Sequence, residues 1–439
     1  MGRFALPGRE ERSMPFVSGM RCVCCQREYP PDAHAYTCPT CGEDDGLLDI
    51  VLDAAAARRS VTRERIAANP DRSVRRWLPL LPVTGVMADG LPSMPRLDIG
   101  GTPLYCAPSL SRQAGVAEVT VKDDGRNPTA SYKDRASAVV IARAREQGIG
   151  LITVASTGNA ASSLAGQCAA EGVATVIFVP RTAPPAKLTQ LLIYGAHVVA
   201  VDGTYDDAFE LSRTATRLFG WYNRNTGYNP YTIEGKKTAA FELAEQLGYN
   251  VPDMVFVPTG DGCIVSGIHK GFTDLRDMGF IDRLPRMIVV QAEGSRAIHN
   301  AFHGGVAEVE NATTVADSIS VNRPRVALHA LRALRESGGD TVLVSDDEIL
   351  AAMPVMARET GVFAEPAAAA ALAGLLAMGR DGRLRGDERV SLMITGNGLK
   401  DVGAAMRAAG REPVPMAPGD EGALRAFGEA LEARAGEGS

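Results

Sequence analysis

Short apolar runs alternate with stretches of helical periodicity through the middle of the chain. The runs rich in β-branched residues are predicted to be strands, at residues 152–156, 174–180, 198–201, 255–258, 287–291 and 391–394. The stretches between them predict helices, at residues 160–171, 186–194 and 205–219. Alternation of this kind is typical of parallel sheets covered by helices, so the sequence predicts an α/β protein.

The predicted elements fall into two α/β units preceded by a longer, less regular segment. Helical patterns at residues 63–68 and 74–80 belong to that segment, which leads into the main body. We expect a flexible N-terminus, a cysteine-rich segment, a wrap that includes the start of the body, a smaller α/β domain, a larger α/β domain and a helical tail, at residues 1–20, 21–50, 51–150, 151–250, 251–403 and 404–439. Ligands of such proteins bind where strand ends meet helix starts.

Charge and hydropathy narrow the class of protein. The 439 residues include 46 basic and 52 acidic side chains, for a net charge of −6, which argues against a general nucleic-acid binder. No apolar run approaches the roughly 20 residues that a membrane span needs. Residues 1–20 contain no apolar signal-peptide region. We therefore expect a cytoplasmic protein without a nucleic-acid or membrane partner.

Four of the eight cysteines form two Cys-x2-Cys pairs near the N-terminus. Cys22 and Cys25 make the first pair, and Cys38 and Cys41 follow after 12 intervening residues. Four thiolates at this spacing can close a tetrahedron around zinc, which leaves no open position for substrate and predicts a structural zinc ribbon. A metal-free ribbon and a cytosolic dithiol pair are the alternatives, and Cys24 is a spare thiol.

Lys133 lies between a loop and an apolar helical pattern. Residues 127–129 predict the loop, and Ser131 is expected to cap the helix over residues 136–144, which places Lys133 in the first turn. The positive end of a helix, desolvation and a bound cofactor all lower the pKa of a lysine, which makes the amine a nucleophile. A solvated surface lysine is the alternative.

Three strand-to-helix turns carry polar or glycine-rich sequences. Residues 156–160 offer two hydroxyls, an amide and backbone N–H groups that suit a carboxylate, although capping also explains these side chains. Residues 259–264 contain two glycines that let the backbone approach an anion. Thr395 follows a strand, and its hydroxyl can bond a ring nitrogen without donating a full charge. An amine, a carboxylate pocket, a phosphate cradle and a neutral hydroxyl are what pyridoxal phosphate needs.

The same segments resemble threonine synthase. The matching stretches, in the order of that family, are residues 127–135, 156–161, 228–238, 260–271, 361–371 and 395–401. The N-terminal cysteine ribbon and the Gly-Thr-Pro-Leu sequence at residues 101–104 are also similar to that family. The resemblance implies a fold-type II pyridoxal phosphate enzyme, similar to the tryptophan synthase β subunit, whose smaller domain is mobile. It also implies a small amino-acid substrate, and we expect a homodimer.

The resemblance also implies a role for individual residues. Lys133 would hold the cofactor covalently and move protons, Asn159 would meet its 3′-oxygen, and Thr395 would face its ring nitrogen. The residues expected to cradle the cofactor phosphate are Gly260, Asp261, Gly262, Cys263 and Ile264. The residues expected to bind the substrate carboxylate are Ser156, Thr157 and Ala160. Glu365, before Pro366, is expected to cap a helix rather than take part in catalysis.

One departure from the family concerns the leaving group. In that family an arginine usually follows Asn-Pro-aromatic and grips the phosphate of O-phosphohomoserine, but Thr232 stands there in this chain and is expected to bind substrate in its place. A threonine lacks the charged, bidentate grip of an arginine. We therefore expect O-phosphohomoserine to be a poor substrate unless Lys236, Lys237 or Arg224 supplies the charge.

Three functions stay open on the sequence alone. The leading interpretation is a threonine synthase-like lyase, nominally converting O-phosphohomoserine to threonine. The second is a β-elimination or β-replacement enzyme with another donor, similar to cysteate synthase or serine/threonine dehydratase. The third is a catalytically silent binding protein with the same fold.

Overall fold

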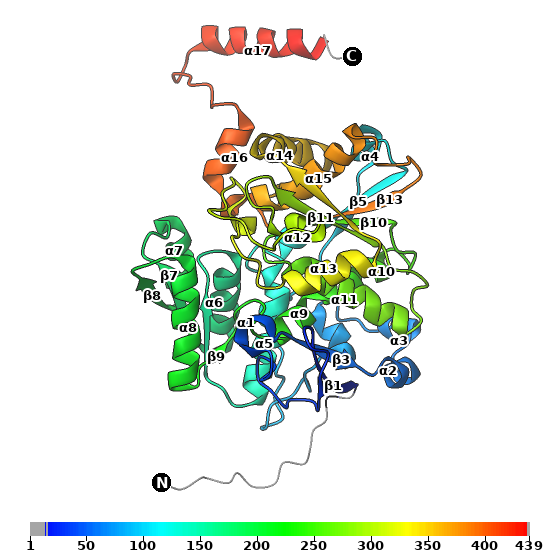
Figure 1. The fold of residues 1–439 in the computed structure, drawn as a ribbon. Helices are drawn as coiled ribbons and strands as arrows, with labels where there is room; N and C mark the ends of the chain where they lie inside the picture. Colours follow the sequence, from blue (N-terminus) through cyan, green and yellow to red (C-terminus); the bar gives the residue numbers. More distant parts are fainter. Residues whose placement is uncertain (1–13, 15, 437–439) are drawn as a thin grey trace.

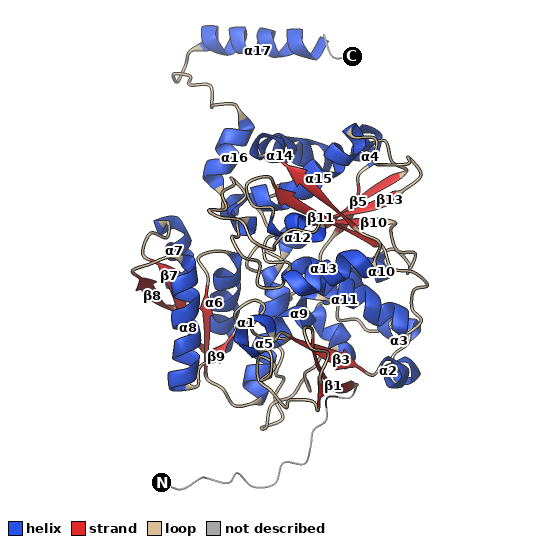
Figure 2. Ribbon diagram, viewed as in Figure 1, coloured by secondary structure: helices blue, strands red, loops and turns tan. Residues whose placement is uncertain are grey.

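The computed structural model describes residue 14 and residues 16–436, whose strands form three sheets (Figures 1 and 2). The largest sheet has the strand order β12-β11-β10-β13-β5-β4. Its strands are β4 (Leu104–Cys106), β5 (Glu118–Asp123), β10 (Met254–Pro258), β11 (Arg286–Ala292), β12 (Asp340–Val344) and β13 (Arg389–Ile394). All its pairings are parallel except that of β4 with β5, which is antiparallel.

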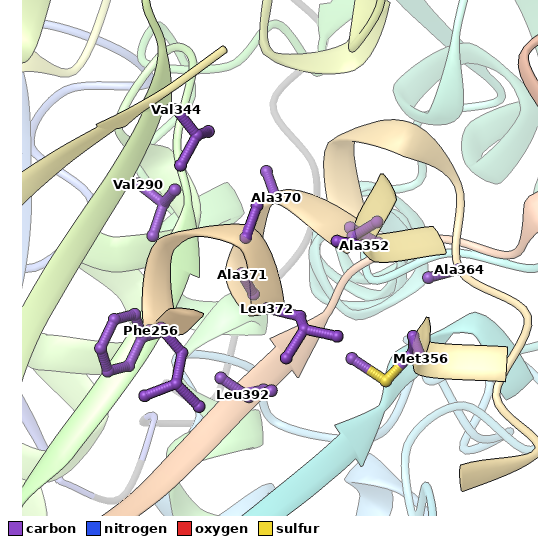
Figure 3. Close-up of a cluster of buried hydrophobic side chains, with 14 of the residues drawn as sticks. Phe256, Val290, Val344, Ala352, Met356, Ala364, Ala370, Ala371, Leu372 and Leu392 are labelled. Atoms are coloured by element: carbon purple, nitrogen blue, oxygen red, sulfur yellow. The ribbon is translucent and has the colours of Figure 1, made fainter. Parts of the chain in front are cut away.

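Alanine-rich packing covers one face of this sheet. Helix α15 (Pro366–Arg380) lays Ala370, Ala371 and Leu372 among buried side chains of β10, β11, β12 and β13 (Figure 3). Small side chains let a helix approach closely, and a Cβ added at Gly374 would lie 2.6 Å from a methyl of Val290. This close packing fixes the position of the start of α15, which reaches the candidate site.

A smaller sheet holds the strands of the second α/β unit in the order β8-β7-β6-β9. Its strands, all parallel, are β6 (Leu151–Ala155), β7 (Ala174–Pro180), β8 (His197–Val201) and β9 (Tyr222–Asn223). The helices of this unit are α6 (Asn159–Glu171), α7 (Pro185–Ile193) and α8 (Tyr205–Phe219). Helix α8 begins with a capping box in which Thr204 and Asp207 each bond the other's backbone amide.

The third sheet is the N-terminal ribbon, with strand order β2-β1-β3. Its strands are β1 (Val17–Cys22), β2 (Glu28–Tyr29) and β3 (Leu48–Leu52), and helix α1 (Gly42–Asp45) lies beside them. Because β1 begins at Val17, the ribbon starts before the boundary at residue 21 that the sequence suggested. The rest of the expected flexible N-terminus, residues 1–13 and 15, lies outside the described residues.

The remaining helices connect and cover the sheets. The α-helices are α2 (Ala54–Ser60), α3 (Arg63–Ala67), α4 (Pro108–Ala114), α5 (Lys133–Glu146), α9 (Tyr231–Lys236), α10 (Thr238–Gln246), α11 (Cys263–Asp277), α12 (Ala297–Phe302), α13 (Ala327–Glu336), α14 (Asp346–Thr360), α16 (Val402–Ala409) and α17 (Glu421–Gly436). The 3-10 helices are η1 (Val74–Leu80), η2 (Asp124–Arg126), η3 (Asp317–Ile319) and η4 (Gly398–Lys400). Helix α17 stands apart from the body (Figure 1). Within the described part of the chain, no helix has the length and apolarity to cross a membrane.

The predicted α/β class is confirmed, and the predicted strands differ from the observed ones by one or two residues at their ends. The prediction that Ser131 caps a helix was wrong. Helix α5 begins at Lys133, and the buried Ser131 hydroxyl has no hydrogen-bond partner in the described structure. No described side chain caps α5, and the Asp134 carboxylate in its first turn instead binds the preceding loop, where it accepts hydrogen bonds from the Thr129 amide at 2.8 Å and the Thr129 hydroxyl at 2.6 Å.

Candidate active site

Lys133 is held at the start of α5 by the loop that follows β13. The Tyr132 amide donates to the Thr395 carbonyl at 2.9 Å, and the Asn397 amide donates to the Ala130 carbonyl at 3.1 Å. The two strand-to-helix turns are therefore joined, although they lie far apart in the sequence. This pairing brings Lys133 and Thr395 to the same cavity.

A buried ion network fixes the first turn of α5. The Arg135 guanidinium donates to Asp124 at 2.6 and 2.9 Å and to Glu242 at 2.6 and 2.8 Å. The Lys122 ammonium lies 2.9 Å from Glu242. All four side chains are buried, and the network joins β5, η2, α5 and α10. Lys133, two residues from Arg135, is positioned by this network.

The expected phosphate cradle forms the start of α11. Residues 259–264 line a cavity of about 50 Å³ together with Lys133, Thr226 and Thr395. The backbone amides of Gly260 through Ile264 donate to no acceptor in the described structure. The Asp261 carboxylate is turned away from them, since it accepts a hydrogen bond from the Arg325 amide at 3.2 Å. A run of free amides at a helix start fits a phosphate group.

Close packing requires glycine at two positions of this turn. Gly262 has a φ of +88°, and a Cβ added there would lie 2.9 Å from Ala330 and 3.0 Å from the Val326 carbonyl. A Cβ at Gly260 would lie 2.9 Å from the Ile319 Cα. Only glycine fits these positions without displacing the backbone that surrounds them.

A second, larger cavity of about 640 Å³ opens beside the first. Thr157, Gly158 and Asn159 line it at the start of α6, and Ser318 and Ala367 line both cavities. The amides of Asn159 and Ala160 donate to no described acceptor, which suits the expected carboxylate at this helix start. The structure thus brings a candidate carboxylate site next to Lys133.

Glu365 belongs to this cavity, which the sequence did not suggest. Its side chain makes no capping hydrogen bond to α15, so the expectation that it caps was wrong. Its Oε1 instead accepts a hydrogen bond from Asn159 Nδ2 at 2.9 Å. Burial raises the pKa of the Glu365 carboxyl, against the attraction of Lys133 and Lys400. Burial also lowers the pKa of Lys133, as does the nearby Arg224 guanidinium, while Glu365 opposes that shift.

Three of the expected substrate-binding residues take different positions. Ser156 accepts a hydrogen bond from the Gly158 amide at 3.2 Å, so its hydroxyl shapes the turn. Ser156, Ala160 and Thr232 do not line either cavity. Thr232 is fully buried, and its hydroxyl donates to the Asn229 carbonyl at 2.8 Å. Thr157 alone among the four side chains reaches the larger cavity.

The four ribbon cysteines converge on one point. Cys22, Cys25, Cys38 and Cys41 place their sulfur atoms within 4.8 Å of one another. The Cys25 and Cys38 sulfurs are 3.8 Å apart. Tetrahedral zinc with bonds of about 2.3 Å separates its sulfur ligands by about 3.8 Å. Burial opposes ionisation of the Cys38 thiol, but hydrogen bonds from the Tyr29 hydroxyl and the amides of Cys41 and Thr40 outweigh it and lower its pKa to about 6. The geometry and the donor set fit a zinc ion.

Comparison with known proteins decides the family. Residues 95–396 match the family model described as pyridoxal-phosphate dependent enzyme. The threonine synthase of Methanocaldococcus jannaschii is 38% identical over 400 residues, which cover 90% of this chain and 96% of that protein. The chain belongs to the threonine synthase family of pyridoxal-phosphate-dependent enzymes. The threonine synthase of Mycobacterium tuberculosis is 37% identical over 321 residues, covering 73% of this chain and 87% of that protein.

Solved structures agree with the fold of this family. Maize serine racemase superposes with a TM-score of 0.60 at 20% identity, over 70% of this chain and 92% of that one. Threonine deaminase isoform 2 from Solanum lycopersicum has a TM-score of 0.60 at 22% identity, and the superposition covers 70% of this chain and 83% of that one. Membership of the family makes the chain a pyridoxal-phosphate-dependent lyase. The free amides of Gly260 through Ile264 fit the phosphate of that cofactor.

Proposed function

We propose that the chain converts O-phosphohomoserine and water to threonine and inorganic phosphate. The observation that carries this proposal is the convergence of Lys133, the free amides of residues 260–264 and the α6 start on two adjoining cavities. The similarity to threonine synthases over nearly their whole length supports it.

The cofactor would be held by residues that line the two adjoining cavities. Lys133 would bind its aldehyde carbon, the amides of residues 260–264 its phosphate, and Thr395 its ring nitrogen. Asn159 would bond the 3′-oxygen after leaving Glu365, to which it now donates. Bound there, pyridoxal phosphate would withdraw electrons through the substrate nitrogen, which acidifies the C–H bond of the amine-bearing carbon and then those of the adjacent carbon.

The residues of the chain would then move protons and hold the substrate. The net reaction breaks the Cγ–O bond and one Cβ–H bond, places the Cβ proton at Cγ, adds the hydroxyl of water at Cβ and releases phosphate, which takes up the remaining proton of water. The Lys133 amine, with a pKa lowered by burial, can accept a proton from substrate carbon and return it. The amides at the start of α6, together with Thr157, would hold the substrate carboxylate.

A product assay tests this function. Protein loaded with pyridoxal phosphate is mixed with O-phosphohomoserine, and threonine and phosphate are both measured. We expect equal amounts of the two, and none from a Lys133→Ala variant. O-phosphoserine, homoserine, serine and threonine are run in parallel, because efficient keto-acid release from one of them, without threonine from O-phosphohomoserine, would identify a different lyase.

We also propose that the four ribbon cysteines hold one structural zinc ion. Four thiolates leave no open position on the metal, so the ion would stabilise the ribbon without touching substrate. Metal analysis of protein purified without chelator should find about one zinc per chain. A Cys38→Ser variant that keeps the parent's zinc content would contradict this ligand set. The homodimer expected from the sequence stays a prediction, which sedimentation equilibrium can test.

A further inference from the structure

Two buried cations next to the smaller cavity lack partners. The Lys236 ammonium is fully buried and has no hydrogen-bond partner in the described structure. Arg224 is also fully buried, and its Nη2 has no partner. Its other contacts are neutral, a hydrogen bond to the Ser137 hydroxyl at 3.2 Å and one to the Thr226 hydroxyl at 3.4 Å. Buried charges are normally paired, so an uncompensated pair calls for an absent anion.

Each cation lies close to residues around the smaller cavity. Thr226, which receives the Arg224 contact, lines the cavity beside Lys133. Lys236 ends α9, which packs closely on α11, because a Cβ added at Gly267 would lie 2.5 Å from the Lys236 Cβ. The charged and titratable groups that act on Lys236 are Cys263, Arg224, Lys133 and Asp261. Both cations therefore lie directly behind residues that line or adjoin the smaller cavity.

Electrostatics show that neither charge is satisfied. Burial lowers the pKa of Lys236 to about 8, and the neighbouring Arg224 and Lys133 contribute to this shift. Burial likewise lowers the pKa of Arg224 to about 10. A bound dianion would reverse both shifts, since an opposite charge favours the charged form of a base.

We propose that Arg224 and Lys236 form the subsite that binds the phosphate of the amino-acid substrate. This inference rests on the proposed function. It assigns to Arg224 and Lys236 the charged contacts with the substrate phosphate that Thr232 cannot make. The cofactor phosphate already has the free amides of residues 260–264, so these two cations serve a second phosphate group. The substrate class is thereby narrowed to amino acids whose leaving group is a dianion.

A binding measurement on the cofactor-loaded enzyme tests this subsite. The probe is L-2-amino-5-phosphonopentanoate, in which a methylene replaces the ester oxygen of O-phosphohomoserine, so it cannot react at that bond. L-norvaline, the same amino acid without the phosphonate, is the matched ligand. Isothermal titration gives the ratio of the two affinities. We expect Lys236→Met and Arg224→Met each to reduce this ratio about tenfold to a hundredfold, the range for one charge-assisted hydrogen bond.

Two control variants separate the subsite from general charge effects. Arg217→Met removes a half-exposed arginine of α8 and should leave the ratio unchanged. Lys236→Arg keeps the positive charge and should retain most of the phosphonate preference. Because the parent ammonium is unpartnered, Lys236→Met is expected to fold and to unfold at a temperature no lower than the parent.

Other outcomes would overturn the proposal. An unchanged affinity ratio in both methionine variants would do so, as would a Lys236→Met protein that fails to fold, since that would make the lysine structural. Weaker pyridoxal phosphate binding in apoenzyme titrations, with the ratio intact, would assign the cations to the cofactor phosphate. Binding needs no turnover, so an enzyme that prefers the phosphonate but releases no threonine would contradict the proposed function and leave this subsite standing.

Discussion

Two groups of buried charge lie near Lys133, and they differ in whether each charge has a partner. In the first group, Arg135 bonds both Asp124 and Glu242, and Lys122 bonds Glu242 as well. In the second, Arg224 Nη2 and Lys236 Nζ have no hydrogen-bond partner among the described residues. Both groups are out of contact with water.

This difference distinguishes residues that stabilise the site from residues that can bind an anionic ligand. A fully paired network stabilises the fold around it, and removing one member leaves an uncompensated charge. An unpaired buried cation destabilises the ligand-free protein, and binding of an anion removes this destabilisation. Substitutions in the two groups should therefore act in opposite directions on stability.

Lys133 is close to both groups, and its removal should have the largest effect. Lys133→Ala should fold, lose the visible absorption of the bound cofactor, and lower kcat by more than about a thousandfold, because the amine both anchors the cofactor and moves protons. Absorption spectra and the threonine assay measure the two effects. Activity within tenfold of the parent would remove Lys133 from the mechanism.

Breaking the paired network should reduce stability next most strongly. Arg135→Met leaves the buried carboxylates of Asp124 and Glu242 without their partner, so the free energy of unfolding should fall by about 3–5 kcal/mol. Denaturant unfolding measures the change. Arg217→Met breaks an exposed pair with Glu43 and should change it by no more than about 1 kcal/mol. Similar losses in the two variants would contradict the role given to the network.

The two groups should also respond to pH in opposite windows. Because the pKa of Lys236 is lowered from 10.5 to about 8, its destabilising effect is complete below pH 8 and is relieved as pH rises toward 10.5. Burial disfavours the charged form of Glu242, but Arg135 and Lys122 outweigh it and lower its pKa to about 2, so its contribution is present above pH 4.5 and is lost as pH falls through 2.

Comparing the Lys236→Met variant with the parent isolates the effect of Lys236 on stability at alkaline pH. The advantage in unfolding free energy of Lys236→Met over the parent should shrink by roughly 2–3 kcal/mol between pH 7.5 and 10.5. Denaturant unfolding at several pH values gives this difference, and effects of other groups cancel between the two proteins. A difference that does not vary with pH would mean that Lys236 is not an unpaired buried base.

Thr232 should give the smallest effect. Thr232→Val removes a hydrogen bond to the Asn229 carbonyl and should lower the unfolding free energy by about 1 kcal/mol. Since Thr232 lies outside both cavities, the KM for O-phosphohomoserine should change less than threefold. A larger rise in KM would mean that Thr232 contacts the substrate, as its place in the family motif suggested.

Local patterns predicted the elements better than the site. Strands and the turns after them depend on nearby residues, so residues 156–160, 259–264 and the position of Thr395 could be found from sequence. The bond between Asn159 and Glu365 joins residues 206 positions apart, and no local signal predicts it. Ser131 was expected to cap because its type suits that role, but tertiary pairing of the adjacent loop moved the start of α5.

The sequence could not predict that Arg224 and Lys236 lack partners, for a different reason. Both residues were noted there as sources of charge, together with Lys237. The structure pairs Lys237 with Glu234 at 2.6 Å and Asp274 at 2.9 Å, whereas Lys236, its neighbour in the chain, has no partner in the described structure. Adjacent lysines of one helical turn face different surroundings, and only the packing of α9 against α11 distinguishes them.

The most direct test of the contrast between paired and unpaired charge uses the double variant Arg224→Met, Lys236→Met. Unfolding free energies of the cofactor-loaded parent and variant are measured with and without L-2-amino-5-phosphonopentanoate. Without the ligand, the variant should be at least as stable as the parent. A ligand concentration of 100 times its Kd should stabilise the parent by about 2.7 kcal/mol, and the same concentration should stabilise the variant far less. A variant that is less stable without the ligand, yet gains as much as the parent from it, would contradict the account.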